Sequence, residues 1–398
     1  MSERNASAGY ISLGKETTKG EAVTPSLVVP YYSQSIATDV SLMSDEPAYG
    51  GKFKRFQSLP GIRKHRGSMQ VMAEPNTAAS LFDMLMTKGN TSGSNPYTHP
   101  YTVSATDPKS YTVDVSYGSY AVRFMGVEAS KISIGWREDE MVFDLDVAAL
   151  KSFYPREISS VTGSGPYTIT LKSNGQYDAP TDGLVVGDTI QVYDVSAGAY
   201  IDCVVDSLTT TTVVVSENVS AGASGDVLSI KPASISLSLL TPFLWPRTRY
   251  FFATDASTAQ TDSATASNQT RLEPGTELSI MHEFKNENGS PRSGSFDPAS
   301  LPRGRYDVSF SFKVYLDTPQ RHRDWEELTK SALVMRSYSG ASSQYELRVT
   351  LNNLKAKNDV NPTEADSIIL HEVDMQPNYD TSDAQAFDVK VINTRSSI

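Results

Sequence analysis

The chain has 398 residues, and its 35 basic and 46 acidic side chains give a formal net charge of −11. This charge argues against tight binding of a nucleic-acid backbone, which requires basic patches. A single cysteine, Cys203, excludes an intrachain disulfide, and no stretch reaches the ~18 consecutive apolar residues that a membrane helix needs. The low charged fraction of 20% and the many Tyr and Phe residues favour sheets over helical bundles.

The first part of the chain predicts strands and one helix. After Pro75, apolar residues at helical spacing from Ala78 to Met86 predict a short amphipathic helix that Gly89 ends. Around this helix, period-two alternation and β-rich composition predict strands over 36–43, 68–73, 120–127, 132–136 and 141–147. One face of each such strand is apolar and the other polar, as in antiparallel sheets with a solvated side.

The segment 157–234 has a different character. Its short β-rich runs are divided by Asn-Gly, Asp-Gly and Gly-Asp pairs, which are typical turn sequences. We interpret it as an inserted small all-β domain, a closed barrel or sandwich of its own. The first domain then covers 1–156, with its last strand at 235–241 after the insert, and the second domain covers 242–398.

The second domain repeats the order of elements in the first. Alternation predicts strands over 277–284, from Tyr306 to Leu316, and over 345–351, 368–375 and 387–392. A second helix is expected after Pro319, with its apolar stripe formed by Trp325, Leu328, Ala332 and Met335. The predicted fold class is therefore mainly β: two tandem sandwich or barrel domains, each with one short flanking helix, plus the inserted domain.

Motifs that carry catalysis are not found in the sequence. It has no nucleophile elbow, phosphate-binding loop or dinucleotide fingerprint, and the position of Cys203 in an apolar strand predicts a core residue. We therefore predict no catalytic, cofactor-binding or metal-binding residues. The histidines lack metal-ligand spacing, which favours a surface or interface role for His65, His99, His282, His322 and His371.

Two groups of polar residues remain as candidates for function. The first is the polar face of the predicted strands, which we expect to be solvated or to line a channel: Asp144, Asp146, Asp307, Ser309, Ser311, Lys313, Glu372 and Asp374. Its carboxylate pairs could instead bind a hard cation or act as acid and base. The second group is a basic cluster in Gly/Pro-rich sequence: Lys52, Lys54, Arg55, Arg63, Lys64, His65 and Arg66.

This basic cluster has two interpretations. It could contact nucleic acid, or it could be a loop that meets an acidic surface of another subunit. The net charge of −11 favours the inter-subunit loop, whose candidate residues are Lys52, Lys54, Arg55, Arg63, Lys64 and Arg66.

Several segments together resemble a known protein family. The opening Gly9-Tyr10-Ile11-Ser12-Leu13-Gly14-Lys15-Glu16-Thr17-Thr18-Lys19-Gly20-Glu21-Ala22-Val23-Thr24-Pro25 is similar to the start of tail tube proteins of long-tailed bacteriophages. In that family a G-K-E-x-x-x-G-x-x-x-x-P stretch leads into the first strand. The helix at 81–86, the 289–304 stretch before a long strand and the closing strand at 389–393 are also similar. The resemblance covers 1–155 and 235–398.

The resemblance implies a structural role without catalysis. Members form rings that stack into a hollow tube for the genome, and those with two fused domains form trimers with pseudo-sixfold symmetry. The implied partners are further copies of the chain, the tape measure protein, and the tail terminator and distal tail proteins. Double-stranded DNA would pass without specific binding. The implied location is the virion tail, assembled in the host cytoplasm, with no membrane and no cofactor.

Some features lie outside the minimal family pattern or leave alternatives open. The insert is expected to project outward, because insertions at surface loops cost little. The long polar stretches 88–110 and 253–275 are candidates for contacts between rings. The alternatives are another virion or surface-array β-protein, such as a distal tail protein, or a glycan-acting enzyme whose insert binds carbohydrate.

Overall fold

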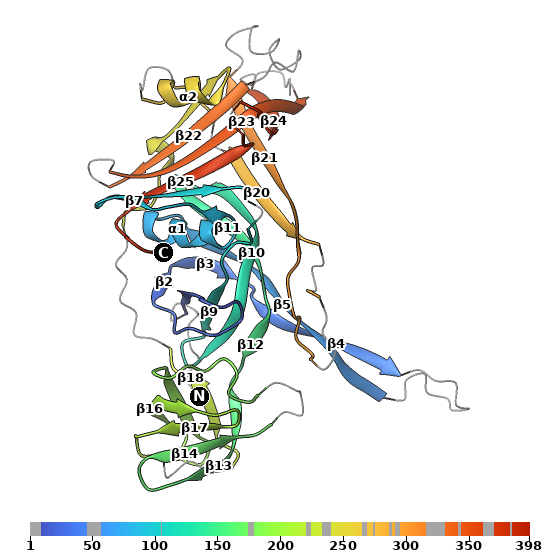
Figure 1. Ribbon diagram of the computed structural model, residues 1–398, viewed down its shortest axis with the longest axis vertical. Coiled ribbons are helices and arrows are strands. Elements are labelled where there is room, and N and C mark those ends of the chain that lie inside the picture. The colour runs from blue at the N-terminus through green and yellow to red at the C-terminus, as the bar shows by residue number, and fades with distance from the viewer. Residues whose placement is uncertain are drawn as a thin grey trace.

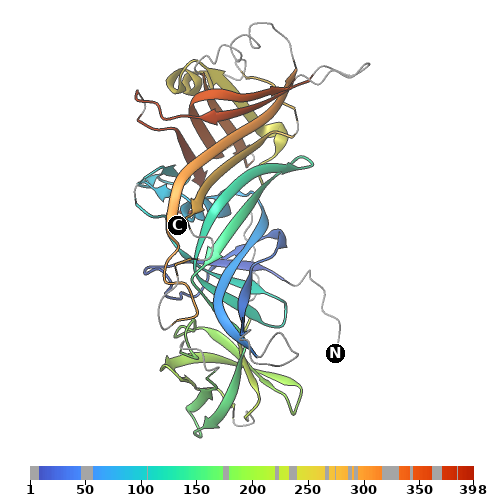
Figure 2. The ribbon, with the colours of Figure 1, turned by 90° about the vertical axis from the view of Figure 1, so that its right-hand side faces the viewer.

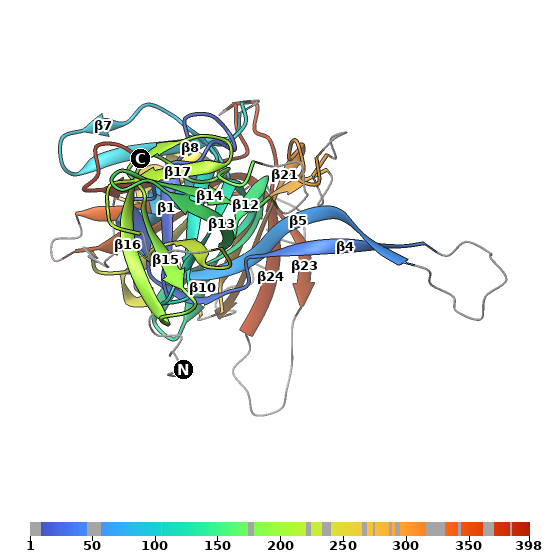
Figure 3. The same cartoon turned by 90° about the horizontal axis from the view of Figure 1, so that it is seen from below.

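The computed structural model describes residues 9–45, 57–104, 106–173, 179–219, 224–232, 240–264, 269–273, 275–285, 289–290, 295–315, 331–340, 344–360, 370–382 and 384–398. Their fold is mainly β, as the sequence predicts, with two short α-helices. The molecule is elongated: the first half lies in the middle, the second half at one end and the insert at the other (Figure 1, Figure 2). An arm formed by the hairpin of β4 and β5 projects sideways (Figure 3).

The elements have the following bounds. In the first half they are β1 (Ile11–Lys15), β2 (Leu27–Val29), β3 (Tyr31–Gln34), β4 (Ala37–Asp45), β5 (Gln57–Met72), α1 (Pro75–Asp83), β6 (Thr87–Lys88), β7 (Ser92–Gly93), β8 (Tyr97–Thr102), β9 (Tyr111–Ser116), β10 (Ala121–Arg137), β11 (Glu140–Ala149) and β12 (Lys151–Phe153). The insert holds β13 (Arg156–Thr162), β14 (Tyr167–Leu171), β15 (Thr189–Asp194), β16 (Ala199–Leu208), β17 (Thr212–Val215) and β18 (Val227–Ile230). The second half has the 3-10 helix η2 (Trp245–Arg247), β19 (Thr248–Ala253), α2 (Ala256–Asp262), β20 (Glu277–Phe284), β21 (Arg303–Tyr315), β22 (Ser331–Ser339), β23 (Tyr345–Val360), β24 (Leu370–Pro377) and β25 (Phe387–Asn393).

One antiparallel sheet, called here the long sheet, runs through both halves. Its strands lie in the order β4, β5, β11, β10, β20, β21, β24 and β23. At the junction of the halves, Ile132 of β10 lies opposite Ile280 of β20, and Ile134 lies opposite Leu278. The halves are therefore joined edge to edge by strand pairing and not by side-chain packing alone.

A second layer of strands packs over each half of the long sheet. In the first half its order is β2, β1, β9, β10 and β12, and in the second half it is β19, β22, β23, β25 and β8. The long strands β10 and β23 take part in both layers, with one end in the long sheet and the other in the second layer. Each half is thus a sandwich closed on one side by a shared strand.

The two halves repeat the same plan. The strand order β4, β5, β11, β10 corresponds to β20, β21, β24, β23. In each set the first two strands form a hairpin. The last two strands form a second hairpin, and they lie in the sheet in the reverse of their order along the chain. The β-bulges also match, and bulges are specific features of a pairing and not accidents. Three bulges of the first half each have a counterpart in the second half. The bulge at Val40/Leu42 matches the one at His282/Phe284, the bulge at Phe124/Val127 matches Leu351/Leu354, and the bulge at Ala129/Lys131 matches Ala356/Asn358.

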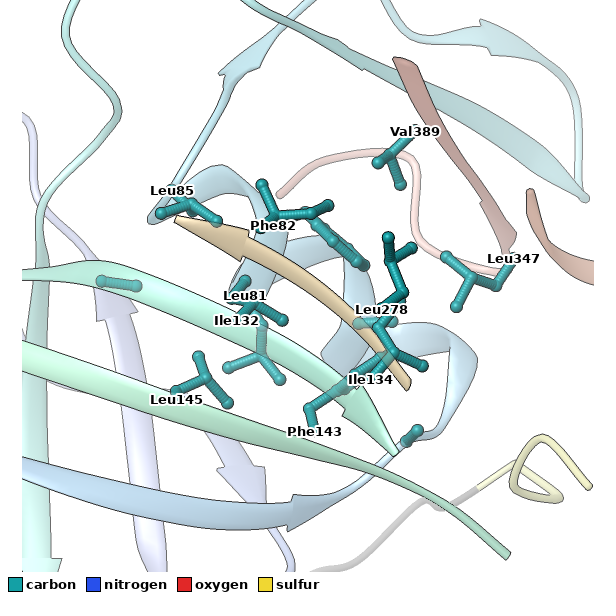
Figure 4. Packing of buried hydrophobic residues seen from close by; sticks show 14 of the residues in the cluster. Leu81, Phe82, Leu85, Ile132, Ile134, Phe143, Leu145, Leu278, Leu347 and Val389 are labelled. Atoms are coloured by element: carbon teal, nitrogen blue, oxygen red, sulfur yellow. The ribbon is translucent and has the colours of Figure 1, made fainter. Parts of the chain in front are cut away.

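Helix α1 lies at the centre of a hydrophobic core that both halves share. Leu81 and Phe82 of α1, with Leu85 just after the helix, pack above Ile132, Ile134, Phe143 and Leu145 of the first half and beside Leu278, Leu347 and Val389 of the second (Figure 4). Glu74 caps the helix by accepting a hydrogen bond from the Thr77 amide at 2.8 Å. Truncation of a fully buried Phe or Leu in such a core costs about 2–5 kcal/mol, so α1 stabilises the union of the halves.

The insert forms a closed barrel of six strands in the order β13, β14, β17, β16, β15 and β18. It has its own hydrophobic cluster, to which Met125 and Phe153 of the first half contribute. This agrees with the barrel or sandwich predicted for the segment. The first strand of the insert, β13, begins at Arg156, next to the predicted boundary at 157. The boundary at 234 and the strand at 235–241 stay predictions, since residues 233–239 lie outside the described residues.

The predicted second helix is wrong in its last part. Ala332 and Met335 belong to β22, in which Ala332, Leu333, Val334 and Met335 are all buried. A strand covered on both faces is apolar at every position, so the helical spacing of two of its residues was coincidental. The other two residues of the expected stripe, in the segment 316–330, lie outside the described residues.

Other differences concern boundaries and one missed helix. The predicted strands 120–127 and 132–136 are one continuous strand, β10, bent at its bulges. The segment 253–275, expected to be a polar loop, contains α2, whose Asp255 side chain accepts a hydrogen bond from the Thr258 amide. The described residues of the basic cluster, interpreted from the sequence as a loop, belong to β5.

Candidate assembly surfaces

The polar residues predicted from alternation share one face of the long sheet, opposite the core. They lie on β11 (Asp144 and Asp146), β21 (Asp307, Ser309, Ser311 and Lys313) and β24 (Glu372 and Asp374), and all are exposed or half-exposed. Five of these eight side chains are carboxylates and one is a lysine, and the half-exposed Lys131 lies opposite Asp146 on the same face. We call the eight residues together the acidic face.

The repeat makes the two predicted carboxylate pairs equivalent. Asp146 pairs with Lys131 next to the bulge of β10, and Asp374 pairs with Asn358 next to the matching bulge of β23. Asp144 therefore corresponds to Glu372 and Asp146 to Asp374. The same acidic pair thus occurs once in each half, at the same height of the long sheet.

Side chains on this face bind their neighbours across strands. Gln70 donates to Asp144 and Gln376 donates to Asp307, both at 2.8 Å. Lys313 lies 3.5 Å from Glu372 in an exposed pair, which contributes little to stability. The carboxylates are arranged in rows and do not converge on a point. Within the described residues, no group of three or more His, Cys, Asp or Glu side chains could hold a metal ion.

Where the structure describes the basic cluster, it lies on strand β5 and not on a loop. Arg63 is buried, and its Nη1 lies 3.5 Å from Oδ1 of Asp297 in the second half. His65 is also buried, with Nε2 3.0 Å from the same oxygen and Nδ1 2.8 Å from Oγ1 of Thr38. Arg63 thus meets a carboxylate of its own chain. The inter-subunit role predicted for the cluster stays a prediction. Lys64 and Arg66 lie on β5, and Lys52, Lys54 and Arg55 lie outside the described residues.

A second ionic contact also joins the halves. The buried Glu128 of β10 accepts hydrogen bonds from Arg303 of β21 at 3.1 Å from Nε and 3.0 Å from Nη2, and it also pairs with Lys19. Arg303 donates further to the Met84 carbonyl at 3.4 Å, just past α1, and Tyr306 donates to the Leu85 carbonyl at 2.9 Å. Carbonyls at a helix C-terminus lack intrahelical partners and favour cations.

The opening motif has a structural explanation. Lys15 pairs with the buried Asp83 of α1 at 2.8 Å. The buried Glu16 accepts four hydrogen bonds of 2.7–3.0 Å, from the Gly20 and Gly126 amides and the Ser110 and Thr112 hydroxyls. A Cβ at Gly14 would lie 2.9 Å from Val23 and 3.0 Å from Pro25, which explains the glycine. The motif fastens the N-terminal strand to the rest of the first half.

The insert is fastened to the first half by a buried charge network. Arg123 of β10 donates to Asp114 of β9 at 2.7 Å and to Asp188 of the insert at 2.6 Å, and it also donates to the Gly183 carbonyl. Burial raises the pKa of Asp114, although Arg123 opposes this shift. Arg123 therefore holds two carboxylates in a setting where either one alone would be costly.

Histidines and the cysteine are mostly internal. His99 is buried and bonds to Asn393 at 3.1 Å, and His282 is buried against Tyr306, with ring centroids 3.8 Å apart. With His65, these two residues are not at the surface of the chain, so the surface part of the expectation is wrong for them. A role at an interface stays a prediction. His322 and the side chain of His371 lie outside the described residues. Cys203 is in the core as predicted, and burial raises the pKa of its thiol to about 12.

Sequence reasoning missed Glu128, Arg123, Asp297 and Arg303. The available signal was a charged residue at an apolar position of a predicted strand, as Arg123 is between Val122 and Phe124. Such a residue indicates a buried ion pair, but the sequence does not reveal its partner.

No helix among the described residues is both long and apolar enough to cross a membrane. No family model matches the chain, and no curated protein matches it.

Proposed function

We propose that the chain is a ring-forming subunit of the tail tube of a long-tailed bacteriophage, whose stacked rings conduct the genome from capsid to host cell. The long sheet is the observation that carries this proposal. Two equivalent four-strand halves are joined edge to edge, and the outer strands are β4 at one edge and β23 at the other. Within the described residues, β4 pairs only with β5, and the 355–360 part of β23 pairs only with β24.

Open edges of this kind favour closure into a ring. An unpaired edge offers backbone donors and acceptors to another chain, and a closed barrel removes every edge. In the repeat, the outer strand β4 corresponds to β20, and the outer strand β23 corresponds to β10. Strands β20 and β10 already pair with each other at the junction of the two halves. The junction inside one chain is thus a template for the contact between two chains.

Three copies would give a wide channel. Each chain supplies eight strands to the long sheet, and 3 × 8 = 24 strands at ~4.8 Å spacing give a circumference of at least ~115 Å. The backbone diameter is then roughly 37 Å or more, which leaves an aqueous lumen after side chains are placed. A DNA duplex fits a lumen of this size. We therefore favour a trimeric ring with pseudo-sixfold symmetry over a ring of six chains.

The acidic face suits the wall of such a channel. Its carboxylates repel phosphates, so DNA would pass without being held, whereas a wall lined by lysines would bind it. The core and the second layer would lie outside this wall. Tape measure, terminator and distal tail proteins are the further partners that this function entails, and the virion tail is the location.

Electron microscopy of the purified protein tests the proposal. We expect rings or short tubes with a central channel in negative stain. A protein that stays monomeric over the accessible concentration range would contradict the proposal.

A further inference from the structure

Apolar side chains are exposed on the projecting arm. Leu42 of β4 is 69% exposed, and Val40 of β4 and Ile62 of β5 are also exposed. Figure 3 shows that the arm extends away from the body of the molecule. Apolar residues grouped on a projecting hairpin mark a contact surface.

A groove lies at the end of the long sheet in the second half. It has a volume of about 470 Å³, and its lining includes His282, Tyr306, Gln376, Tyr379 and Phe387. His282 is 7% exposed and stacks on Tyr306, and Tyr379 and Phe387 add further rings, so the groove has aromatic walls that suit an apolar side chain.

The matching bulges show what Leu42 corresponds to in the second half. In the arm, the pairing passes from Val40–Arg63 to Leu42–Pro60 across the bulge. Across the bulge of β20 and β21, the pairing changes from His282–Tyr306 to Phe284–Arg303. In both bulges the pairing moves by two residues along the first strand and by three along the second. Leu42 is therefore the counterpart of Phe284.

Phe284 has a binding site within its own chain. It packs against Ala148 and Leu150, at and just after the end of β11 in the first half, and against Leu301, just before β21. The repeat relates β11 to β24, with Asp146 corresponding to Asp374, so Ala148 corresponds to Gln376. Gln376 lines the groove. The site that Phe284 fills in the first half thus has a counterpart in the second half that the described residues leave open.

We propose that this groove receives Leu42 from the arm of the next copy of the chain. The inference rests on the proposed ring function and specifies its contact. The strand register follows from the junction, where Lys131 lies opposite Met281. When the two halves are aligned on their matching bulges, Lys131 corresponds to Asn358 and Met281 corresponds to Asp39. Strand β23 of one copy then pairs antiparallel with β4 of the next, with Asn358 of the first opposite Asp39 of the second.

Thiol cross-linking tests this contact. The double variant Leu42→Cys/Gln376→Cys places one thiol on the arm and one in the groove, and the buried Cys203 does not compete. By the register, Leu42 of one copy lies opposite Lys355 of the other, one strand from Gln376, so the two Cα atoms are ~10 Å apart. With a short bis-maleimide cross-linker we expect covalent dimers and trimers on denaturing gels. The control Leu42→Cys/Gln70→Cys has its second thiol on the acidic face of the first half, far along β5 from the arm, and should remain uncrosslinked.

Electron microscopy of the same samples separates the two levels of the inference. Rings without cross-links in the Leu42→Cys/Gln376→Cys variant would overturn the groove contact and leave the ring function standing. Absence of rings in all variants and in the wild type would overturn both.

A substitution series gives a second measurement. Leu42→Asp should raise the concentration needed for ring assembly roughly tenfold or more, because it removes a buried leucine and adds a buried charge. Val186→Asp is the matched control, since Val186 is similarly exposed but lies on the insert. Equal assembly by Leu42→Asp and Val186→Asp would contradict the proposal.

Discussion

At the scale of single residues, the most informative side chains are charged ones that are buried at strand positions where the alternation of the sequence predicts apolar residues. Glu16, Arg123 and Glu128 are each buried and fully engaged by partners from other elements. Strand alternation is enough to predict that the residues of the acidic face are exposed, because exposure follows directly from strand periodicity. That they line a channel stays a prediction. It could not place Arg63, since the burial of that residue depends on Asp297, a contact distant in the chain.

Replacement of Glu16 tests the opening motif. Glu16→Gln keeps the shape but turns an amide NH₂ toward hydrogen-bond donors, so at least one buried donor loses its acceptor. We expect the free energy of unfolding to fall by about 2 kcal/mol, measured by urea denaturation. The exposed Glu21→Gln should change it by less than about 0.5 kcal/mol. A similar small effect for Glu16→Gln would contradict the role assigned to this residue.

The pH dependence of stability tests the setting of His282. Burial, with the charge of Arg303 as a second cause, lowers the pKa of His282 to about 4. Between about 6.5 and 4 the unfolded chain binds a proton at this position that the folded chain does not, so folding stability falls as the pH drops through this range. His282→Phe keeps a ring stacked on Tyr306 and removes the titration.

The comparison between these two proteins isolates the effect of His282. From pH 7 to pH 4.5, the wild type should lose about 2 kcal/mol more of its unfolding free energy than His282→Phe does. Urea denaturation at each pH provides the measurement. Parallel pH profiles would show that His282 is not buried as the structure describes.

At the scale of elements, the sequence predicts those that carry their own periodicity. Helix α1 and strands β11, β20 and β25 are recognisable because one face is apolar and the other polar. Helix α2 has no apolar stripe, since its residues are mostly Ala, Ser, Thr and Gln, so only its Asp255 cap signals it. The sequence of strand β22 does not alternate between apolar and polar residues, because the strand is covered on both faces. Such burial is decided by tertiary packing and is not visible locally.

The contact between the β20–β21 hairpin and β5 can be tested through Asp297. Asp297→Ala leaves Arg63 and His65 buried without this carboxylate, and removing one partner of a buried ion pair costs about 3–5 kcal/mol. We expect a loss of about 3 kcal/mol in thermal or urea unfolding. Asp307→Ala, an exposed carboxylate on β21, should be close to neutral. Comparable losses in both variants would refute the assigned contact.

At the scale of the whole molecule, the repeat explains most of the architecture. Two halves with little sequence identity share strand order and bulge positions, so pairing geometry is retained where side chains are not. Element order in the sequence suggested this repeat, but the bulges and the edge-to-edge junction could not be predicted. They depend on pairing between strands far apart in the chain.

The insert provides a prediction at the same scale. It is a separate barrel attached through β18 and the Arg123 network. We expect a reconstruction of the assembled tube to show its density outside the channel wall. Density for 157–234 inside the channel would contradict this arrangement.

The mass of isolated rings tests the central claim most directly. The account holds that one chain supplies two equivalent sixths of a closed barrel, so a ring contains three chains. Native mass spectrometry should then give 3 × 43.4 kDa, about 130 kDa. A ring of six chains, near 260 kDa, would contradict the equivalence of the two halves in the assembly.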